Sequence, residues 1–513
     1  MNKKQTSKNL FSNIITLIVN VTLGFFYTPY LVKSLGIAAY GIIPLALIIN
    51  QYINVLTGSI TGSLTRFYSI ALQQGKTLEA SKYLSTIIAA ILIFIALLLP
   101  LAYIVIIKID SLFNIPLEYI DNARTLFAFT LLSFFLSLIS SALNITLYAL
   151  NRLDLLNVIS ILRTTFKVTA AILFLEMLDK NIAYIGIATL VAELSVFITS
   201  IYYFILTTNH EVKIKINYFD MPKLATVLAM TTWIIIIQIG DIGLQRVDII
   251  LVNIFWGTKE TGILGALSEF GTYITSIVSV FSSLFGPLIL LSYSREDHNE
   301  VKRIIKNNAL IIGILTACIV GLFMGFSNEI TELWLGKEFT SYSIWLIFKL
   351  LHIPFFMVGG MFTFVFRSWN MIKLPAIFTI VIGIVNFSVL LLMYKYGHRS
   401  AYTITLSLLF SSLLIICQTY LFGIWYMKRI YPDSKYTPYI RTTISICIAL
   451  CILYILSKIY IFYFISIINL QGLMVGISIV GLTGLTFVWF FIISREQKQY
   501  LLKEVLINKY SHV

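Results

Sequence analysis

Charge is the scarcest feature of this sequence. Only 12% of its 513 residues are Asp, Glu, Lys or Arg, whereas 58% are hydrophobic, and the mean hydropathy is +0.91. A soluble protein of this length needs far more polar surface, so the composition excludes a water-soluble globular protein. Apolar stretches of about 20 residues or more recur along the whole chain, and each is long enough to cross the hydrocarbon core of a membrane.

Cysteine and histidine are also scarce, with four and five residues. All four cysteines lie in apolar stretches without metal-ligand spacing, so we expect buried small apolar side chains rather than disulfides. The sequence Gly75-Lys76-Thr77 resembles the end of a phosphate-binding loop, but Ile70 stands where that motif needs its first glycine. We therefore expect no catalytic residue, no metal site, no cofactor and no ATPase activity.

About fourteen apolar stretches predict an all-α polytopic membrane protein, because an open sheet edge cannot be satisfied in lipid. The expected spans lie near residues 10–32, 40–71, 83–107, 125–149, 155–178, 182–207, 225–255, 261–291, 309–326, 340–366, 374–394, 402–427, 442–465 and 471–493. If the N-terminus is cytoplasmic, the cytoplasmic segments hold 23 Lys and Arg and the outer segments hold 9. This bias predicts that both termini are cytoplasmic. It also explains the net charge of +14 without nucleic acid as a partner.

An internal repeat divides the chain. The segment YLVKSLGIAAYGII at 30–43 matches LVNIFWGTKETGIL at 251–264, with Gly36 over Gly257 and Gly41 over Gly262, and a second match lays Asn151 over Asn370. Nearly equal shifts predict two pseudo-symmetric six-helix lobes related by an axis along the membrane normal. The expected parts are an N-lobe at 1–207, a cytoplasmic linker at 208–224, a C-lobe at 225–430, and two further spans with a cytoplasmic tail at 431–513. The alternating apolar and basic residues at 212–216 suit an interfacial segment or a solvated linker.

Two short motifs carry a family resemblance. They are Leu35-Gly36-x-x-x-Tyr40-Gly41 after the first span, and NMIKLPAIFTIVIGIVNFSVLLLMYKYG at 370–397, with Lys373, Pro375, Gly383 and Asn386. With these motifs, the span count and the short loops, the chain resembles the O-antigen and capsule polysaccharide flippases of the multidrug/oligosaccharidyl-lipid/polysaccharide (MOP) exporter superfamily. The resemblance implies a flippase with a V-shaped central cavity between its two lobes. Such a flippase moves undecaprenyl-pyrophosphate-linked oligosaccharide repeat units across the bacterial inner membrane by alternating access. Membrane lipid and other polysaccharide-assembly proteins are the further partners that it implies.

Three alternatives remain open at this point. The lipid II flippase, which moves a peptidoglycan precursor, resembles the same fourteen-span plan, whereas multidrug or cation antiporters of the superfamily more commonly have twelve spans. A membrane glycan polymerase or ligase is the rival from another class. Such an enzyme would need a large extracytoplasmic loop for its catalytic groups, and the short loops argue against it.

Charged and amide side chains inside spans are the candidate functional residues, because intramembrane charges are costly and mark transport pathways. The candidates for a cationic cavity that binds pyrophosphate are Arg66, Arg163, Lys167, Arg246 and Lys349. The candidates for a polar cavity lining are Asn13, Asn20, Asn50 and Asn54, whose alternative role is hydrogen bonding between packed helices. Glu193 is an acidic residue near the middle of the expected span at 182–207.

The acidic candidates Asp241, Asp248 and Glu269 are expected to bind a coupling ion, H⁺ or Na⁺, or to form static salt bridges between helices. In one continuous helix over 225–255, Asp241 and Asp248 are seven residues apart and share a face with Gln245. Arg246 would then point about 140° away from Asp241, towards the cationic cavity.

We predict that Arg66→Glu and Arg246→Glu each abolish surface polysaccharide while the protein still inserts into the membrane, because charge reversal repels a phosphate anion. The measurement is a polysaccharide blot with quantification of the protein in membrane fractions. Normal export by both variants would refute the anion-binding role.

Overall fold

The computed structural model describes residues 3–48, 67–72, 74–283, 285, 289, 292, 295–369, 371–433, 435–464 and 470–500. Regular structure within these residues is helical throughout and includes no strand, which confirms the all-α polytopic fold. Twelve of the described helical segments are long and apolar enough to cross a membrane, and they match twelve of the fourteen expected spans. Of the other two, most of the span at 40–71 lies outside the described residues, and the span at 225–255 is two helices.

The chain forms two compact units. Unit 1 comprises Met1–Gly265 and Thr379–Gly383, and unit 2 comprises Ala266–Phe378 and Ile384–Val513. The helices that lie wholly in unit 1 are α1 (Lys3–Leu35), α2 (Ile37–Tyr40), α4 (Thr77–Ile107), α5 (Ile109–Leu112), α6 (Ile120–Ala149), α7 (Leu153–Met177), α8 (Ala183–Thr208), α9 (Met221–Gln245) and α10 (Val247–Trp256). Helix α11 (Thr258–Ser283) begins in unit 1, and the lobes expected at 1–207 and 225–430 stay a prediction.

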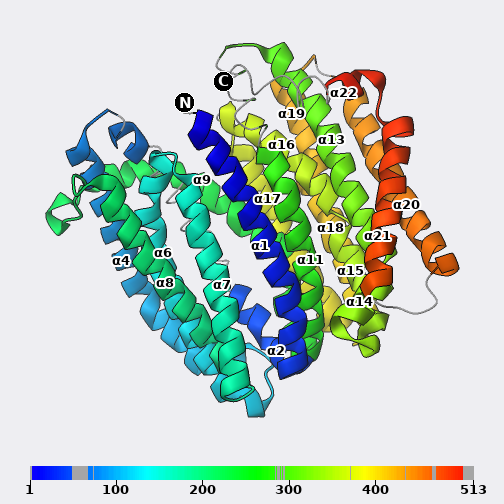
Figure 1. Cartoon of the computed structure of the whole chain (residues 1–513), viewed down its shortest axis with the longest axis horizontal. Coiled ribbons are helices and arrows are strands. Elements are labelled where there is room, and N and C mark those ends of the chain that lie inside the picture. The colour runs from blue at the N-terminus through cyan, green and yellow to red at the C-terminus, as the bar shows by residue number, and fades with distance from the viewer. Residues whose placement is uncertain are drawn as a thin grey trace. The chain divides into compact units, whose positions relative to one another are not determined.

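Five long helices of unit 1 pack side by side. Helix α4 contacts α6, α6 contacts α8, α8 contacts α7, and α7 contacts α1 (Figure 1). The backbones of α6 and α8 approach closely at Gly186, where an added Cβ would lie 2.9 Å from the carbonyl oxygen of Leu126. Leu84 and Ile87 of α4 pack with Leu138 of α6 in a buried apolar cluster. Helix α7 is thereby held between α8 on one side and α1 on the other.

The linker that follows α8 is bound along α4. The backbone N–H groups of Lys213 and Lys215 donate to Ser81 Oγ at 3.0 Å and Ser85 Oγ at 3.1 Å. The N–H of Asp220 donates to Thr86 Oγ1 at 3.0 Å, and the Asp220 side chain then caps α9 by accepting from Lys223 N–H. Val212 is buried, whereas Ile216 is 89% exposed. An exposed isoleucine among lysines is the pattern that suits a membrane interface.

Unit 2 is built on α13 (His298–Gly325). Its other helices are most of α11, α14 (Ser327–Leu335), α15 (Ser343–Leu350), α16 (Ile353–Ser368), most of α17 (Lys373–Tyr396), α18 (Ala401–Ile416), α19 (Phe422–Ile430), α20 (Thr437–Phe464), α21 (Leu470–Phe487) and α22 (Arg495–Tyr500). Helix α13 contacts α16, α20 and α21 (Figure 1). Gly325 of α13 lies directly against α20, since an added Cβ would be 2.4 Å from Ser457 Cβ. Helices α20 and α21, the last two of the expected spans, are therefore integral to the packing of this unit.

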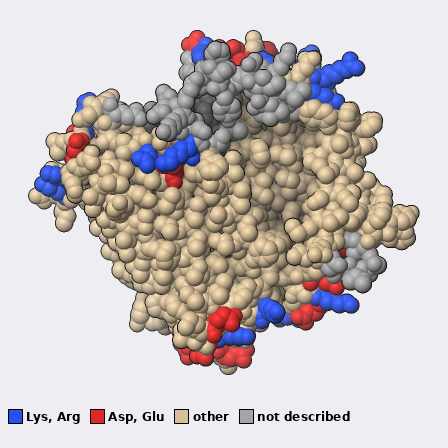
Figure 2. Space-filling model, viewed as in Figure 1, with Lys and Arg blue, Asp and Glu red and all other residues tan. Residues whose placement is uncertain are grey.

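All four cysteines are free, but the expectation that they are buried is wrong for two of them. Cys318 is buried in α13, whereas Cys447 and Cys451 are exposed on the outer face of α20. Cysteine is apolar enough to face lipid, so an apolar stretch does not by itself imply burial within protein. On the face drawn in Figure 2, the charged residues gather towards the ends of the helices, and the long stretches between them are uncharged. That distribution fits helices that cross a bilayer.

The internal repeat appears in unit 1 as two equivalent turns. Gly36 with φ 82° ends α1, and Gly257 with φ 99° ends α10; such positive φ angles favour glycine. After each turn the equivalent glycines contact one another's helix. A Cβ on Gly41 would lie 1.9 Å from Thr258 O, and a Cβ on Gly262 would lie 2.3 Å from Ile37 O. Thr258 is the repeat equivalent of Ile37, so the contact is reciprocal, as expected at a two-fold axis.

We predict that Gly41→Ala and Gly262→Ala each lower the free energy of unfolding by about 1–3 kcal/mol, because the added methyl group overlaps backbone. The measurement is thermal unfolding of the purified protein in detergent. Gly360→Ala is the matched control, since no heavy atom lies within 4 Å of its added Cβ. Equal unfolding midpoints for the three variants would contradict the close crossing.

Candidate functional site

A polar interface joins α1 to α7 along the whole of their contact. Its hydrogen bonds lie at four levels, which pair Asn9 with Asn151 and Asp154, Ser12 and Asn13 with Asn157, Asn20 with Ser160 and Thr164, and Tyr30 with Glu176. Residue numbers rise together on both helices, so the helices run parallel. From Asn9 to Tyr30 the helix rises about 32 Å, which matches the thickness of the hydrocarbon core. We call this set of contacts the α1–α7 polar interface.

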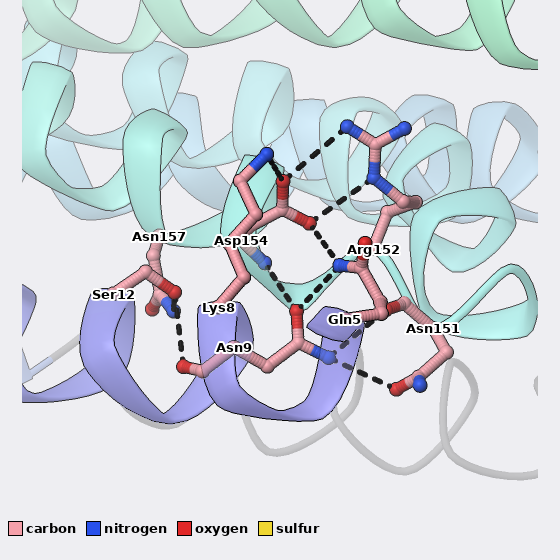
Figure 3. A network of polar contacts seen from close by, with 8 residues as sticks. All are labelled: Gln5, Lys8, Asn9, Ser12, Asn151, Arg152, Asp154 and Asn157. Carbon is pink, nitrogen blue, oxygen red and sulfur yellow. Dashed lines mark hydrogen bonds and ion pairs between the residues drawn. The ribbon is translucent and has the colours of Figure 1, made fainter. Parts of the chain in front are cut away.

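The first level is centred on the buried carboxylate of Asp154, whose side chain is 4% exposed (Figure 3). It contacts Lys8 Nζ at 2.8 Å, Gln5 Nε2 at 2.8 Å and Arg152 Nε at 3.1 Å. The two cations are partly exposed, so they remain hydrated while they neutralise the buried acid. The group carries a net charge of +1 at the start of α7.

Asn9 holds the turn between α6 and α7 (Figure 3). Its Nδ2 donates to Asn151 O at 3.0 Å and to Asn151 Oδ1 at 3.1 Å. Asn151 has φ 56°, a left-handed conformation that asparagine tolerates. The Oδ1 of Asn9 accepts from the backbone N–H of Asp154 at 3.1 Å. Since the N-cap residue Arg152 makes no side-chain cap, Asn9 satisfies an N-terminal donor of α7 from another helix.

The next two levels use amides and hydroxyls. Asn157 Nδ2 donates to Ser12 Oγ at 2.8 Å and also to Asn13 Oδ1. Thr164 Oγ1 donates to Asn20 Oδ1 at 2.7 Å. Asn13 and Asn20, two of the four amides expected to line a cavity, therefore make hydrogen bonds between helices. Their contact with substrate stays a prediction.

Arg163 and Lys167 lie one turn apart in the middle of α7. Arg163 Nε is 2.8 Å from Glu193 Oε1 of α8, so this cation already has an acidic partner. The Arg163 side chain is 44% exposed, whereas that of Glu193 is 11% exposed. The Arg163 side chain therefore keeps surface that water or an anion can reach.

The expectation of one continuous helix over 225–255 is wrong. Helix α9 ends at Gln245, Arg246 has φ −127° and ψ −12°, and α10 begins at Val247. Gly240 and Gly243 precede this break, and glycine is a poor helix former. Gly243 lies against Gly383 of α17. A Cβ added to Gly243 would be 3.6 Å from the Cα of Gly383.

The break also removes the single-helix geometry on which the shared face of the two aspartates was predicted. Asp241 is half-buried in α9, whereas Asp248 is buried in the first turn of α10. The Asp248 Oδ1 accepts from the backbone N–H of Ile249 at 3.0 Å. A carboxylate at this position stabilises the start of a helix. Their roles in ion coupling stay predictions, as does anion binding by Arg246.

The remaining candidates are distributed as follows. Arg66, Asn50 and Asn54 lie outside the described residues. Glu269 of α11 and Lys349 of α15 are half-buried in unit 2. Among the residues that the structure describes, no group of three or more His, Cys, Asp or Glu could hold a metal ion.

Comparisons with known proteins identify the fold. No protein-family model matches the chain. The uncharacterized membrane protein EpsK of Bacillus subtilis (strain 168) is 26% identical over 433 residues, which is 83% of this chain and 84% of EpsK. A solved structure of the lipid II flippase MurJ in an inward closed conformation superposes with TM-score 0.70 and 17% identity, over 93% of this chain and 98% of MurJ. An inward-facing multidrug resistance MATE family transporter of the MOP superfamily gives TM-score 0.64 and 15% identity, over 82% of this chain and 100% of the transporter.

The chain has the fold of the MOP transporters. Within this fold, sequence reasoning found the charged residues in the spans but not the first level of the α1–α7 polar interface. The missed residues are Gln5, Lys8, Asn9 and Asp154 of the first level, and Asn157 of the second. A detectable signal was present, because Asn157, Ser160 and Thr164 recur at helical spacing on α7, as Asn9, Asn13 and Asn20 do on α1. Two polar stripes on apolar helices predict that the helices pair.

We predict that Asp154→Asn lowers the free energy of unfolding by about 1–3 kcal/mol, because it removes the charge that Lys8 and Arg152 neutralise. The measurement is thermal unfolding in detergent at constant salt. Asp121→Asn is the control, since Asp121 forms an ion pair with Arg124 but its side chain is 94% exposed, so little stability should be lost. Equal losses in both variants would show that burial of Asp154 has no energetic role.

Proposed function

We propose that the protein is a flippase for undecaprenyl-pyrophosphate-linked oligosaccharide repeat units. It would carry them across the bacterial inner membrane for surface polysaccharide synthesis, with both termini in the cytoplasm. The observation that carries the proposal is the similarity to the lipid II flippase MurJ along 93% of this chain. The MATE family transporter, although fully covered, leaves nearly a fifth of this chain without a counterpart. The extra length favours a flippase over a multidrug antiporter.

The chemistry of unit 1 supports an amphiphilic substrate with a large polar headgroup. Amides and hydroxyls follow the α1–α7 polar interface through the full thickness of the hydrocarbon core, and such groups can hydrogen-bond sugar hydroxyls when they face a lumen. Arg163 and Lys167 offer positive charge at mid-depth, where a diphosphate needs compensation. The exposed guanidinium is suited to a phosphate, because its N–H groups match phosphate oxygens in pairs.

Alternating access is the proposed mechanism. We propose that the helices that meet at the reciprocal glycine contact move against each other during this cycle. Gly41 and Gly262 let two repeat-equivalent helices touch backbone to backbone. Contacts between small residues hold few interdigitated side chains, so they can separate and re-form without repacking a core. An ion gradient is the proposed energy source, with Asp241, Asp248 and Glu269 as candidate binding groups.

A second candidate, transport of lipid II, is favoured by the MurJ similarity itself. Both substrates are expected to share an undecaprenyl diphosphate and differ in their sugars. Both functions therefore require the cationic residues to bind the same diphosphate, whereas they require the amides to bind different sugars.

We predict that the purified protein in proteoliposomes moves a fluorescent undecaprenyl-pyrophosphate-linked oligosaccharide to the opposite leaflet, and does so faster under an imposed H⁺ or Na⁺ gradient. The measurement is accessibility of the sugar to a membrane-impermeant glycosidase, with lipid II and protein-free vesicles as parallel arms. Faster movement of lipid II would favour the second candidate, and movement of neither would refute both. Full, still ion-dependent transport by Asp241→Asn, Asp248→Asn and Glu269→Gln would remove these three residues from the coupling role.

A further inference from the structure

The ion pair between Arg163 and Glu193 lies at the middle of the membrane. Each residue is the eleventh of its helix, in α7 and α8, so each lies about 15 Å from the start of its helix. The two helices pack side by side (Figure 1). An ion pair at this depth is costly unless it serves a pathway, because both partners must leave water.

The two partners of the ion pair differ in burial: the acid is buried in the protein, and the side chain of the base is partly exposed. Glu193 is buried, and its Oε2 accepts no hydrogen bond from any described residue. The Arg163 side chain is 44% exposed. A charged side chain is costly against lipid tails at mid-depth, so we expect this exposed face of α7 to meet water. Glu193 contacts Arg163 from the protein side, while part of the Arg163 side chain stays exposed.

The local charge is unbalanced in favour of an incoming anion. Lys167 follows Arg163 by one turn on the same face of α7, so two cations stand near one carboxylate. Helices α1 and α6, which also contact α7 or α8, add no acid at this depth. Neither the segment between Lys8 and Lys33 nor the segment between Arg124 and Ala149 contains Asp or Glu.

We propose that Glu193 is the internal counter-ion of a phosphate-binding site, and that it occupies Arg163 until the diphosphate of the substrate takes its place. This inference rests on the proposed flippase function. The carboxylate weakens phosphate binding, because the ion pair must open first. Weakened binding has a purpose in a carrier, since a substrate that is held too tightly is not released. After release, Glu193 restores the pair and the empty site is neutralised again.

The test compares native protein with Glu193→Gln in lipid nanodiscs, using undecaprenyl pyrophosphate without sugar as the probe. We expect the variant to bind the probe about ten-fold more tightly, because the amide keeps the shape of the side chain and removes the competing charge. Binding of undecaprenol, which lacks phosphate, should not change. Equal or weaker binding of undecaprenyl pyrophosphate by Glu193→Gln would overturn the inference.

Two further variants make the test specific. Arg163→Gln should weaken binding of undecaprenyl pyrophosphate. Adding Glu193→Gln to that variant should not restore affinity, because the Glu193 carboxylate competes with phosphate only for Arg163. Glu118→Gln is the control, an exposed carboxylate of unit 1 outside the α1–α7 polar interface, and it should bind as the native protein does. If Glu193→Gln does not fold, Glu193→Asp serves instead, since a shortened acid weakens the pair and should raise affinity by a smaller factor.

The outcomes separate this inference from the function on which it rests. Native protein that binds undecaprenyl pyrophosphate, with no gain in Glu193→Gln, would remove only the counter-ion role. Failure of the native protein and of every variant to bind the probe would contradict the flippase proposal itself. A gain that persists in the Arg163→Gln background would show that Glu193 acts by general repulsion rather than through the pair.

Discussion

Hydrocarbon offers no water to a polar group, and the organisation of unit 1 follows from this constraint. A hydroxyl within a span can bond to its own helix, but an amide or a charge needs a partner on another helix or an aqueous lumen. The α1–α7 polar interface meets the requirement with side chains at four levels, and the pair of Arg163 and Glu193 meets it between α7 and α8. Helix α7 is therefore bonded through polar groups on two sides. Each such bond contributes only about 0.6 kcal/mol on average, so the arrangement is specific without being rigid.

Close approach of backbones is the second organising feature. Glycine permits it where α6 meets α8, where α13 meets α20, and where the two repeat-equivalent turns meet at Gly41 and Gly262. Lipid tails are as apolar as leucine, so helices gain little from burying large side chains against one another. They associate instead through contact area, and small residues increase that area. The same property suits a transporter, because smooth surfaces slide or part more readily than interlocked ones.

The sequence predicted what depends on local composition. Twelve spans were correct because span length and hydropathy reflect bilayer thickness alone. The repeat aligned Gly36 with Gly257 without predicting their conformation, and the structure has equivalent turns at both. The break at Arg246 was missed, since hydropathy does not report backbone angles, and the continuous helix assumed for Asp241 and Asp248 was wrong for that reason. The partners of Asn13, Asn20 and Arg163 also stayed open, because they depend on which helices are neighbours in space.

The parallel pairing of α1 with α7 has a consequence for how the protein is made. Asn13 and Asn20 find their partners on a helix that is synthesised about 140 residues later, which at roughly 5–20 residues per second is a delay of about ten to thirty seconds. During that interval the amides of α1 have no intramolecular partner on α7, and lipid cannot satisfy them.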